Sequence, residues 1–166
     1  MGHRLALLRD GQVEQVGPVE DVFRRPATSE AAALLGIRNL FRARVVDASP
    51  AGLLLDWDGL LLEAPLQRAA AGEAVTAYVR PEDVKILYPD RPLGPSVRAN
   101  QVEGVIVTHR GQGSFHTLYV AIANGHEIEV RFPAYAYVPL RLAAGERVRL
   151  SLRREGVVLL PAKPVE

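Results

Sequence analysis

The chain has 166 residues, a formal net charge of +1, 23% charged residues and no cysteine. The balanced charge gives no bulk attraction to nucleic acid or to an anionic membrane, and the lack of cysteine excludes disulfides, thiolate nucleophiles and cysteine-ligated zinc. No apolar run approaches the roughly 20 residues that a membrane-spanning helix needs, and the charge at Arg9 ends the N-terminal apolar stretch too early for a signal peptide. We expect a cytoplasmic protein of one domain or two small ones, without a membrane-inserted segment.

The first 36 residues predict a hairpin followed by two short helices. Asp10-Gly11 suits a two-residue hairpin turn, because both positions tolerate a positive φ. Pro18 favours the first turn of a helix, Ser29 is the expected N-cap of the next helix, and Gly36 is its expected end. The expected elements are strands over 4–9 and 12–17 and helices over 18–24 and 29–35.

From residue 38 onward, apolar residues alternate with polar ones, which is typical of β-strands. Three prolines and a glycine between 89 and 95 indicate a linker. We expect no long helix after Gly36. The expected strands cover 39–47, 52–57, 59–63, 74–80, 85–88, 101–109, 114–123, 126–132, 146–153 and 157–160.

The hairpin around Asn124-Gly125 allows its register to be predicted. A three-residue loop that ends at this glycine places Val120 opposite Ile128 and Leu118 opposite Val130, so apolar residues share one face. A two-residue loop would place the same strand residues opposite charged ones. The longer loop also puts glycine at the left-handed position of a bulged turn, and we therefore expect it.

Residues 68–87 and 141–160 form an internal repeat at an offset of 73. Ten of the twenty aligned positions are identical, and Asn39 and Asn100 correspond loosely at the start of each copy. Each copy is short for an independent core. We expect two small β units that pack on each other, or that each complete a five-stranded OB-like barrel.

Catalytic and metal-binding motifs are missing from the sequence. It contains no Gly-x-x-x-x-Gly-Lys-Ser/Thr phosphate loop and no Gly-x-Ser-x-Gly nucleophile motif. His116 and His126 fall far apart along their predicted hairpin, so we expect no shared metal, and the four histidines are interpreted as surface or strand-edge residues. We predict no catalytic residue, no cofactor and no metal site in this chain.

Two groups of polar residues could form a binding site or could be ordinary surface residues. Ser96, Arg98 and Asn100 combine a hydroxyl, a guanidinium and an amide that would suit a bound oxyanion, or they form a polar entry to a strand. The arginines at 147, 149 and 153 share a strand face. They would suit single-stranded nucleic acid, or they form a solvated face, which we favour because no aromatic residues are interleaved with them.

Several stretches resemble, in order, the C-terminal part of the ATPases that energise import of molybdate, tungstate, sulfate, iron and spermidine by ABC transporters. The stretch 78–84, which reads Tyr-Val-Arg-Pro-Glu-Asp-Val, resembles the most recognisable motif of the TOBE domain in these subunits. The other matching stretches are 4–17, 20–27 and 35–41 at the end of the ATPase domain, and 99–104 and 145–150 in the second TOBE lobe.

This resemblance implies a mainly β fold of two OB-like (TOBE) lobes with a short α/β remnant of an ATPase domain. The implied ranges are 1–37 for the remnant, 38–88 for the first lobe and 96–161 for the second lobe. The implied role is regulation and homodimerisation of an ATP-binding subunit for import of a solute such as an inorganic oxyanion. Its partners would be ABC permease subunits, at the cytoplasmic side of the inner membrane.

The resemblance also assigns residue roles. Arg80, Pro81, Glu82 and Asp83 are expected to form a structural turn that joins the lobes, because the first and third of these recur in the repeat. In molybdate-type relatives a Ser-x-Arg-Asn motif binds oxyanion, and 96–100 resembles it with one extra residue.

The departures from the family define the remaining expectations. The phosphate loop, the signature motif and the catalytic residues are missing, so this chain should not bind ATP and Mg²⁺ or hydrolyse ATP as the full-length family does. The hairpin and helices over 4–35 should be poorly packed, or docked opportunistically, without the sheet they normally contact. The alternatives are a free-standing oxyanion-binding module and, third, an OB-type nucleic-acid-binding protein.

Overall fold

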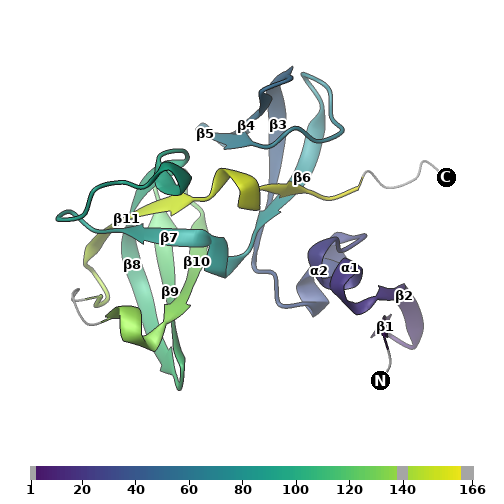
Figure 1. The fold of residues 1–166 in the computed structure, drawn as a ribbon, viewed down its shortest axis with the longest axis horizontal. Helices are drawn as coiled ribbons and strands as arrows, with labels where there is room; N and C mark the ends of the chain where they lie inside the picture. Colours follow the sequence, from purple (N-terminus) through teal and green to yellow (C-terminus); the bar gives the residue numbers. More distant parts are fainter. Residues whose placement is uncertain (1–2, 138–141, 162–166) are drawn as a thin grey trace.

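A computed structural model describes residues 3–137 and 142–161 (Figure 1). The described chain is mainly β, with two five-stranded sheets and a separate two-stranded hairpin at the N-terminal end. The two sheets form two lobes that lie side by side, and the hairpin with its two helices lies beside the first lobe. This confirms the predicted mainly β, two-lobe architecture.

The N-terminal segment folds as a hairpin and two helices. Strands β1 (Arg4–Arg9) and β2 (Gln12–Pro18) join at Asp10 and Gly11, whose φ values of +50° and +79° confirm the expected turn. Helices α1 (Val19–Arg24) and α2 (Ser29–Leu34) follow.

The N-cap of α2 is Thr28, and the prediction of Ser29 was wrong by one residue. Thr28 has an extended backbone, and its Oγ1 accepts a hydrogen bond from the amide of Ala31 at 3.0 Å. Ser29 already has the helical backbone of the first turn, so its hydroxyl lies too far along the helix to cap it.

The helices are docked on the first lobe through Tyr78. Its ring is buried against Ala32 and Ile37, and its hydroxyl donates to the carbonyl of Arg24 at 2.9 Å. Burial raises the pKa of Tyr78 above its usual value, with the charge of Arg80 acting in the opposite direction. The helices are therefore docked on the first lobe, which was one of the two expected outcomes.

Each lobe is one five-stranded antiparallel sheet. The first has the order β12-β6-β3-β4-β5 and the second the order β10-β9-β8-β11-β7. The strands of the first are β3 (Asn39–Ser49), β4 (Gly52–Trp57), β5 (Leu60–Ala64), β6 (Ala74–Val79) and β12 (Val158–Leu159). Those of the second are β7 (Val84–Leu87), β8 (Gln101–Gln112), β9 (Phe115–Ile122), β10 (Glu127–Pro133) and β11 (Arg147–Leu152). Four 3-10 turns complete the described elements: η1 (Pro81–Asp83), η2 (Pro95–Val97), η3 (Ala134–Tyr137) and η4 (Arg154–Gly156).

The lobes exchange one strand each. Strand β7 follows the first lobe in sequence but pairs with β11 of the second, while β12 follows the second lobe and pairs with β6 of the first. The contiguous ranges 38–88 and 96–161 therefore do not describe the two sheets. The chain crosses between lobes at η1 and returns at η4, and each crossing lets a short strand complete the other sheet (Figure 1).

The internal repeat is visible in the pairing. Tyr78 pairs with Val158, and the repeat equivalents Ser151 and Lys85 also pair. The long strands β3 and β8 have bulges at corresponding places, between Val45 and Asp47 and between Ile106 and Thr108. The lobes are thus related by an approximate two-fold arrangement.

One buried apolar cluster extends through both lobes. The predicted register of the β9–β10 hairpin is confirmed, because Val120 pairs with Ile128 and Leu118 with Val130, and all four side chains are fully buried. Further members from the first lobe include Val45, Leu55, Leu62 and Val79. Since the cluster is shared, the two sheets form one structural unit.

Candidate functional site

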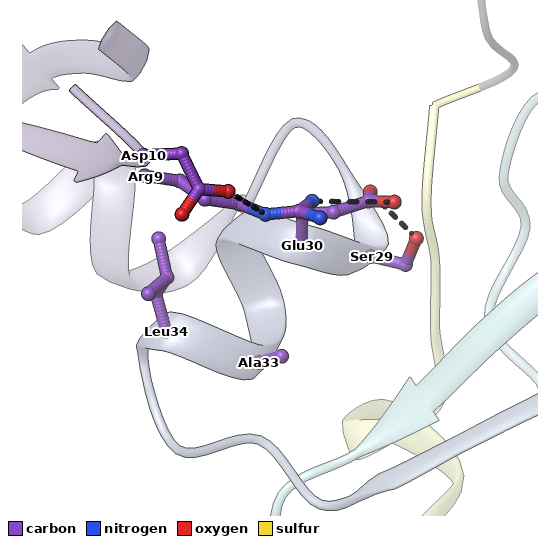
Figure 2. A pocket seen from close by; sticks show the side chains of 6 residues that line it. All are labelled: Arg9, Asp10, Ser29, Glu30, Ala33 and Leu34. Atoms are coloured by element: carbon purple, nitrogen blue, oxygen red, sulfur yellow. Dashed lines mark hydrogen bonds and ion pairs between the residues drawn. The ribbon is translucent and has the colours of Figure 1, made fainter. Parts of the chain in front are cut away.

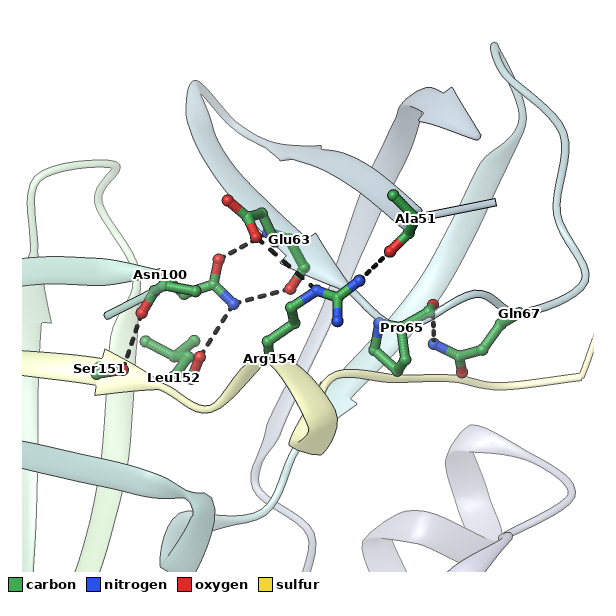
Figure 3. Close-up of polar contacts among 9 residues, drawn as sticks. Ala51, Glu63, Pro65, Gln67, Asn100, Ser151, Leu152 and Arg154 are labelled. Atoms are coloured by element: carbon green, nitrogen blue, oxygen red, sulfur yellow. Dashed lines mark hydrogen bonds and ion pairs between the residues drawn. The ribbon is translucent and has the colours of Figure 1, made fainter. Parts of the chain in front are cut away.

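The junction between the lobes contains one of the predicted ligand residues. Asn100 has a left-handed backbone, with φ of +52°, at the start of β8. Its Oδ1 accepts from the amide of Glu63 at 2.7 Å, and its Nδ2 donates to the carbonyls of Glu63 and Leu152 at 2.8 and 3.0 Å (Figure 3). The Asn100 amide thus joins β5 of the first lobe to β11 of the second.

Asn39 makes the equivalent contact from the other lobe. It is 6% exposed, its Oδ1 accepts from the amide of Glu129 at 2.7 Å, and its Nδ2 donates to the carbonyl of the same residue at 2.8 Å. Glu129 lies on β10, an outer strand of its sheet, as Glu63 lies on β5. Each asparagine therefore satisfies backbone groups on the outer strand of the opposite lobe.

An arginine covers the Asn100 side of the junction. The guanidinium of Arg154, on η4, donates to the carbonyl of Ala51 and lies 3.8 Å from the carboxylate of Glu63 (Figure 3). Gly52 lies directly beside it, and a Cβ there would meet the guanidinium and the carbonyl of Ala64. The glycine leaves the room that the arginine fills.

The predicted structural turn lies at the crossing of the two chain segments. Pro81, Glu82 and Asp83 form η1, and Pro81 is buried. The carbonyl of Asp83 accepts from the amide of Arg153 at 3.1 Å, and the two side chains lie 3.5 Å apart as an ion pair. The repeated arginine of the second copy thus contacts the turn of the first copy.

Ser96 and Arg98 lie at the surface near Asn100. Both side chains are exposed, on and directly after η2, and the carbonyl of Arg98 accepts from Nε2 of Gln101 at 3.1 Å. The amide of Asn100 is engaged with backbone groups, so a ligand here would depend mainly on Ser96 and Arg98.

Two histidines form a contact that the sequence did not suggest. His109 on β8 and His116 on β9 bring Nε2 and Nδ1 to 2.7 Å. Burial and the nearby His116 lower the pKa of His109 below its usual value. His126 lies elsewhere, 2.6 Å from Asp58 and against the ring of Trp57, so it shares no site with His116, as expected.

A groove of about 530 Å³ lies between the N-terminal hairpin and α2 (Figure 2). The guanidinium of Arg9 lies between Asp10 and Glu30, at 3.5 and 3.8 Å, and Ser29 donates to Glu30 at 2.8 Å. The lining residues are Arg9, Asp10, Ser29, Glu30, Ala33 and Leu34. This feature was not predicted, because it depends on how the hairpin packs on the helix.

The N-terminal hairpin has an apolar outer face. Leu8 pairs with Val13 and Ala6 with Val16, and all four side chains are exposed. The opposite face of the hairpin, which includes the buried Gly17, packs toward the helices. Antiparallel sheets with one solvated face normally carry polar residues there, so this hairpin has the pattern of a sheet covered on both faces.

A family comparison assigns the C-terminal half of the chain. Residues 77–160, which include the 78–84 motif, match the TOBE domain. The chain belongs to the TOBE domain family. This confirms the family on which the two-lobe expectation was based.

Curated relatives extend the similarity beyond the TOBE domain. A molybdate/tungstate import ATP-binding protein, WtpC of Thermococcus kodakarensis, is 37% identical over 98 residues, covering 59% of this chain and 27% of that protein. A spermidine/putrescine import ATP-binding protein, PotA of Marinobacter nauticus, is 30% identical over 173 residues, covering 99% of this chain and 43% of PotA. The chain thus resembles part of the ATP-binding subunits of ABC importers and spans less than half the length of these relatives.

A solved structure shares the fold. The molybdate-bound form of the cytoplasmic molybdate-binding protein ModG superposes with a TM-score of 0.63 at 22% identity, covering 75% of this chain and 97% of that one. This likeness supports the OB-like architecture of the two lobes.

Two features are absent from the described residues. Over 3–137 and 142–161, no helix has the length and apolar character to cross a membrane. In the same residues, no group of three or more histidine, aspartate or glutamate side chains is arranged to hold a metal ion.

Proposed function

We propose that the chain is the C-terminal regulatory and dimerisation portion of an ABC importer ATP-binding subunit. It would act at the cytoplasmic side of the inner membrane, next to permease subunits, in import of a solute for which an inorganic oxyanion is the first candidate. The main support is the match to PotA, which covers 99% of this chain, N-terminal hairpin included, and 43% of the relative.

The hairpin supports this proposal independently. Its outer face, with Leu8, Val13 and Val16 between 53% and 62% exposed, has the apolar character of a buried sheet. An isolated two-stranded hairpin is marginally stable, and covering this face would stabilise it. We infer that an ATP-binding segment covers it, either in the same polypeptide or in a separate one.

ATP and Mg²⁺ do not fit this chain. Its sequence has no phosphate-binding loop, whose backbone amides and lysine would hold the nucleotide. Nucleotide binding and hydrolysis are therefore assigned to the ATP-binding segment, and this portion is proposed to pair two such subunits and to respond to the solute.

The first experiment is to read the genomic frame upstream of the codon for Met1 and the neighbouring genes. An ATP-binding segment with a phosphate loop, fused or adjacent, is expected. Its absence from both places would overturn the proposal.

The second experiment tests the hairpin contact. The encoded ATP-binding segment is produced with this chain, fused or separate as the genome has it, and compared with a Leu8→Asp/Val13→Asp variant. The double variant should lower the melting temperature of the fused protein or abolish co-purification of separate chains. Leu61→Asp/Leu66→Asp, at two exposed leucines outside the hairpin, is the matched control. Equal behaviour of the two variants would count against the contact.

The likeness to a molybdate-bound structure supports a second candidate, a free-standing oxyanion-binding module. Ser96 and Arg98 are exposed and would contact the anion. Molybdate at ~100 times its dissociation constant should stabilise the chain by about 2.7 kcal/mol, and Arg98→Ala should remove this effect. No stabilisation by molybdate or tungstate, or an unchanged effect in Arg98→Ala, would reject this candidate.

A further inference from the structure

The His109–His116 contact is produced by the bulge in β8. Ile106 pairs with Val120, but after the bulge His109 pairs with Leu118, so the strand has gained one residue at Val107. Without that extra residue, His109 would alternate to the outer face of the sheet. The bulge turns it to the same side of the second sheet as His116.

Neighbouring residues pack closely against the His116 ring. The His116 ring stacks on Phe132, with centroids 5.6 Å apart and an interplanar angle of 16°. It also lies over Gly111, where a Cβ would come within 3.2 Å of its Cε1. A larger residue at 111 would crowd this ring, so the glycine provides the space that it occupies.

His109 has the hydrogen bonding of a metal ligand. Besides its contact with His116, His109 forms a hydrogen bond with the backbone of Leu142. This bond raises the pKa of His109, so the His109 ring is its donor. Metal-bound histidines usually donate one ring N–H to a carbonyl or carboxylate, and this fixes the tautomer and leaves the other nitrogen as a ligand. Metal binding requires the neutral imidazole, and burial together with the neighbouring His116 lowers the pKa of His109.

We propose that His109 and His116 form a two-histidine site for a divalent transition cation such as Zn²⁺, Ni²⁺ or Cu²⁺. The metal would replace the proton between Nε2 of His109 and Nδ1 of His116, and water would complete its coordination. Zinc–nitrogen bonds of about 2.0–2.1 Å at a tetrahedral angle place the two nitrogens about 3.3 Å apart. The observed 2.7 Å therefore has to widen by about 0.6 Å when a metal binds. The site is independent of the proposed transporter role.

Metal binding is measured on the tag-free full chain by equilibrium dialysis against ZnCl₂ in a buffer without chelators or phosphate, with MgCl₂ as the comparison. About one zinc ion per chain is expected at pH 7.5, with affinity falling more than tenfold at pH 5.5 as the imidazoles protonate. The variants are His109→Ala and His116→Gln. His126→Ala and His3→Ala are the controls, because they remove histidines outside the site. Loss of zinc in the first two variants and retention in the controls supports the proposal.

A second measurement does not depend on variants that fold poorly. Ni²⁺ added to the wild-type chain should selectively broaden the imidazole proton signals of His109 and His116, before those of His3 and His126. No zinc binding, zinc binding unchanged in a folded His109→Ala variant, or broadening that starts at another histidine would overturn the proposal.

Discussion

The side-chain amide of Asn39 satisfies both backbone groups of Glu129 in a buried position. Asn39→Ala removes both bonds and leaves an amide and a carbonyl on β10 without these partners. We expect a loss of about 2–4 kcal/mol in the free energy of unfolding, measured by urea denaturation.

Asn124→Ala is the matched control for this prediction. Asn124 also bonds across the lobes, to the carbonyl of Trp57 at 3.0 Å, but it is only partly buried. The Asn124→Ala substitution should lower the free energy of unfolding by about 0.5–1.5 kcal/mol. A smaller loss for Asn39→Ala than for Asn124→Ala would show that the buried amide contact does not stabilise the lobe junction.

The lowered pKa of His109 predicts a pH dependence of stability. Above the unfolded pKa of about 6.5, the group is neutral in both states and has no effect. As the pH falls below this value, the unfolded chain takes up the proton first, so stability decreases until the folded pKa is passed. Urea midpoints of the wild type between pH 7.5 and 5.5, in EDTA, should fall more steeply than those of His109→Gln. Parallel curves for the two proteins would contradict this assignment.

Close approach of neighbouring strands explains one strand glycine. Gly104 on β8 pairs with Ile122, and a Cβ at this position would come within 2.5 Å of the carbonyl of Ala121 and of Val120. Gly104→Ala should therefore destabilise the chain by about 1–3 kcal/mol, since β8 and β9 would have to shift apart at this position. Gly94→Ala is the control, because no atom lies within 4 Å of its Cβ position. Thermal unfolding of both variants checks the prediction, and equal melting temperatures would contradict it.

Local patterns in the sequence predict elements and registers well in this chain. The β9–β10 register follows from two apolar pairs and from a glycine at the turn, all within 13 residues. The repeat at an offset of 73 predicts two copies of one unit, and the pairing of both copies confirms it. These features depend on neighbours in the sequence, where alternation and turn chemistry are informative.

Long-range placement was not predictable in the same way. Strands β7 and β12 have four and two residues, and so short an apolar run is equally compatible with either sheet. His109 was assigned to no site because the bulge in β8 reverses the face of the sheet on which its side chain lies. No residue pattern in the sequence predicts this bulge. The interlobe role of Asn100 was missed because its partners, Glu63 and Leu152, are 37 and 52 positions away.

The exchanged strands predict that the whole molecule unfolds in one step. The single tryptophan, Trp57, is buried in the first lobe, and Leu118 is buried in the second. Leu118→Ala should lower the free energy of unfolding by about 2–5 kcal/mol. If the molecule unfolds in one step, the urea transition followed by Trp57 fluorescence should report this whole loss. An unshifted Trp57 transition, with a separate transition in second-lobe amide signals, would show that the lobes unfold independently.

Strand exchange also constrains the order in which the protein acquires structure during its synthesis. The first lobe lacks its outer strand until β12 has been translated, and Leu159 bonds to Gln67, which left the ribosome 92 residues earlier. Asn39 likewise waits for Glu129, 90 residues later. Contacts of such separation slow folding, because the loop entropy is lost before the contact forms. The nascent first lobe must therefore remain incomplete, with an unpaired edge on β6, until β12 has emerged.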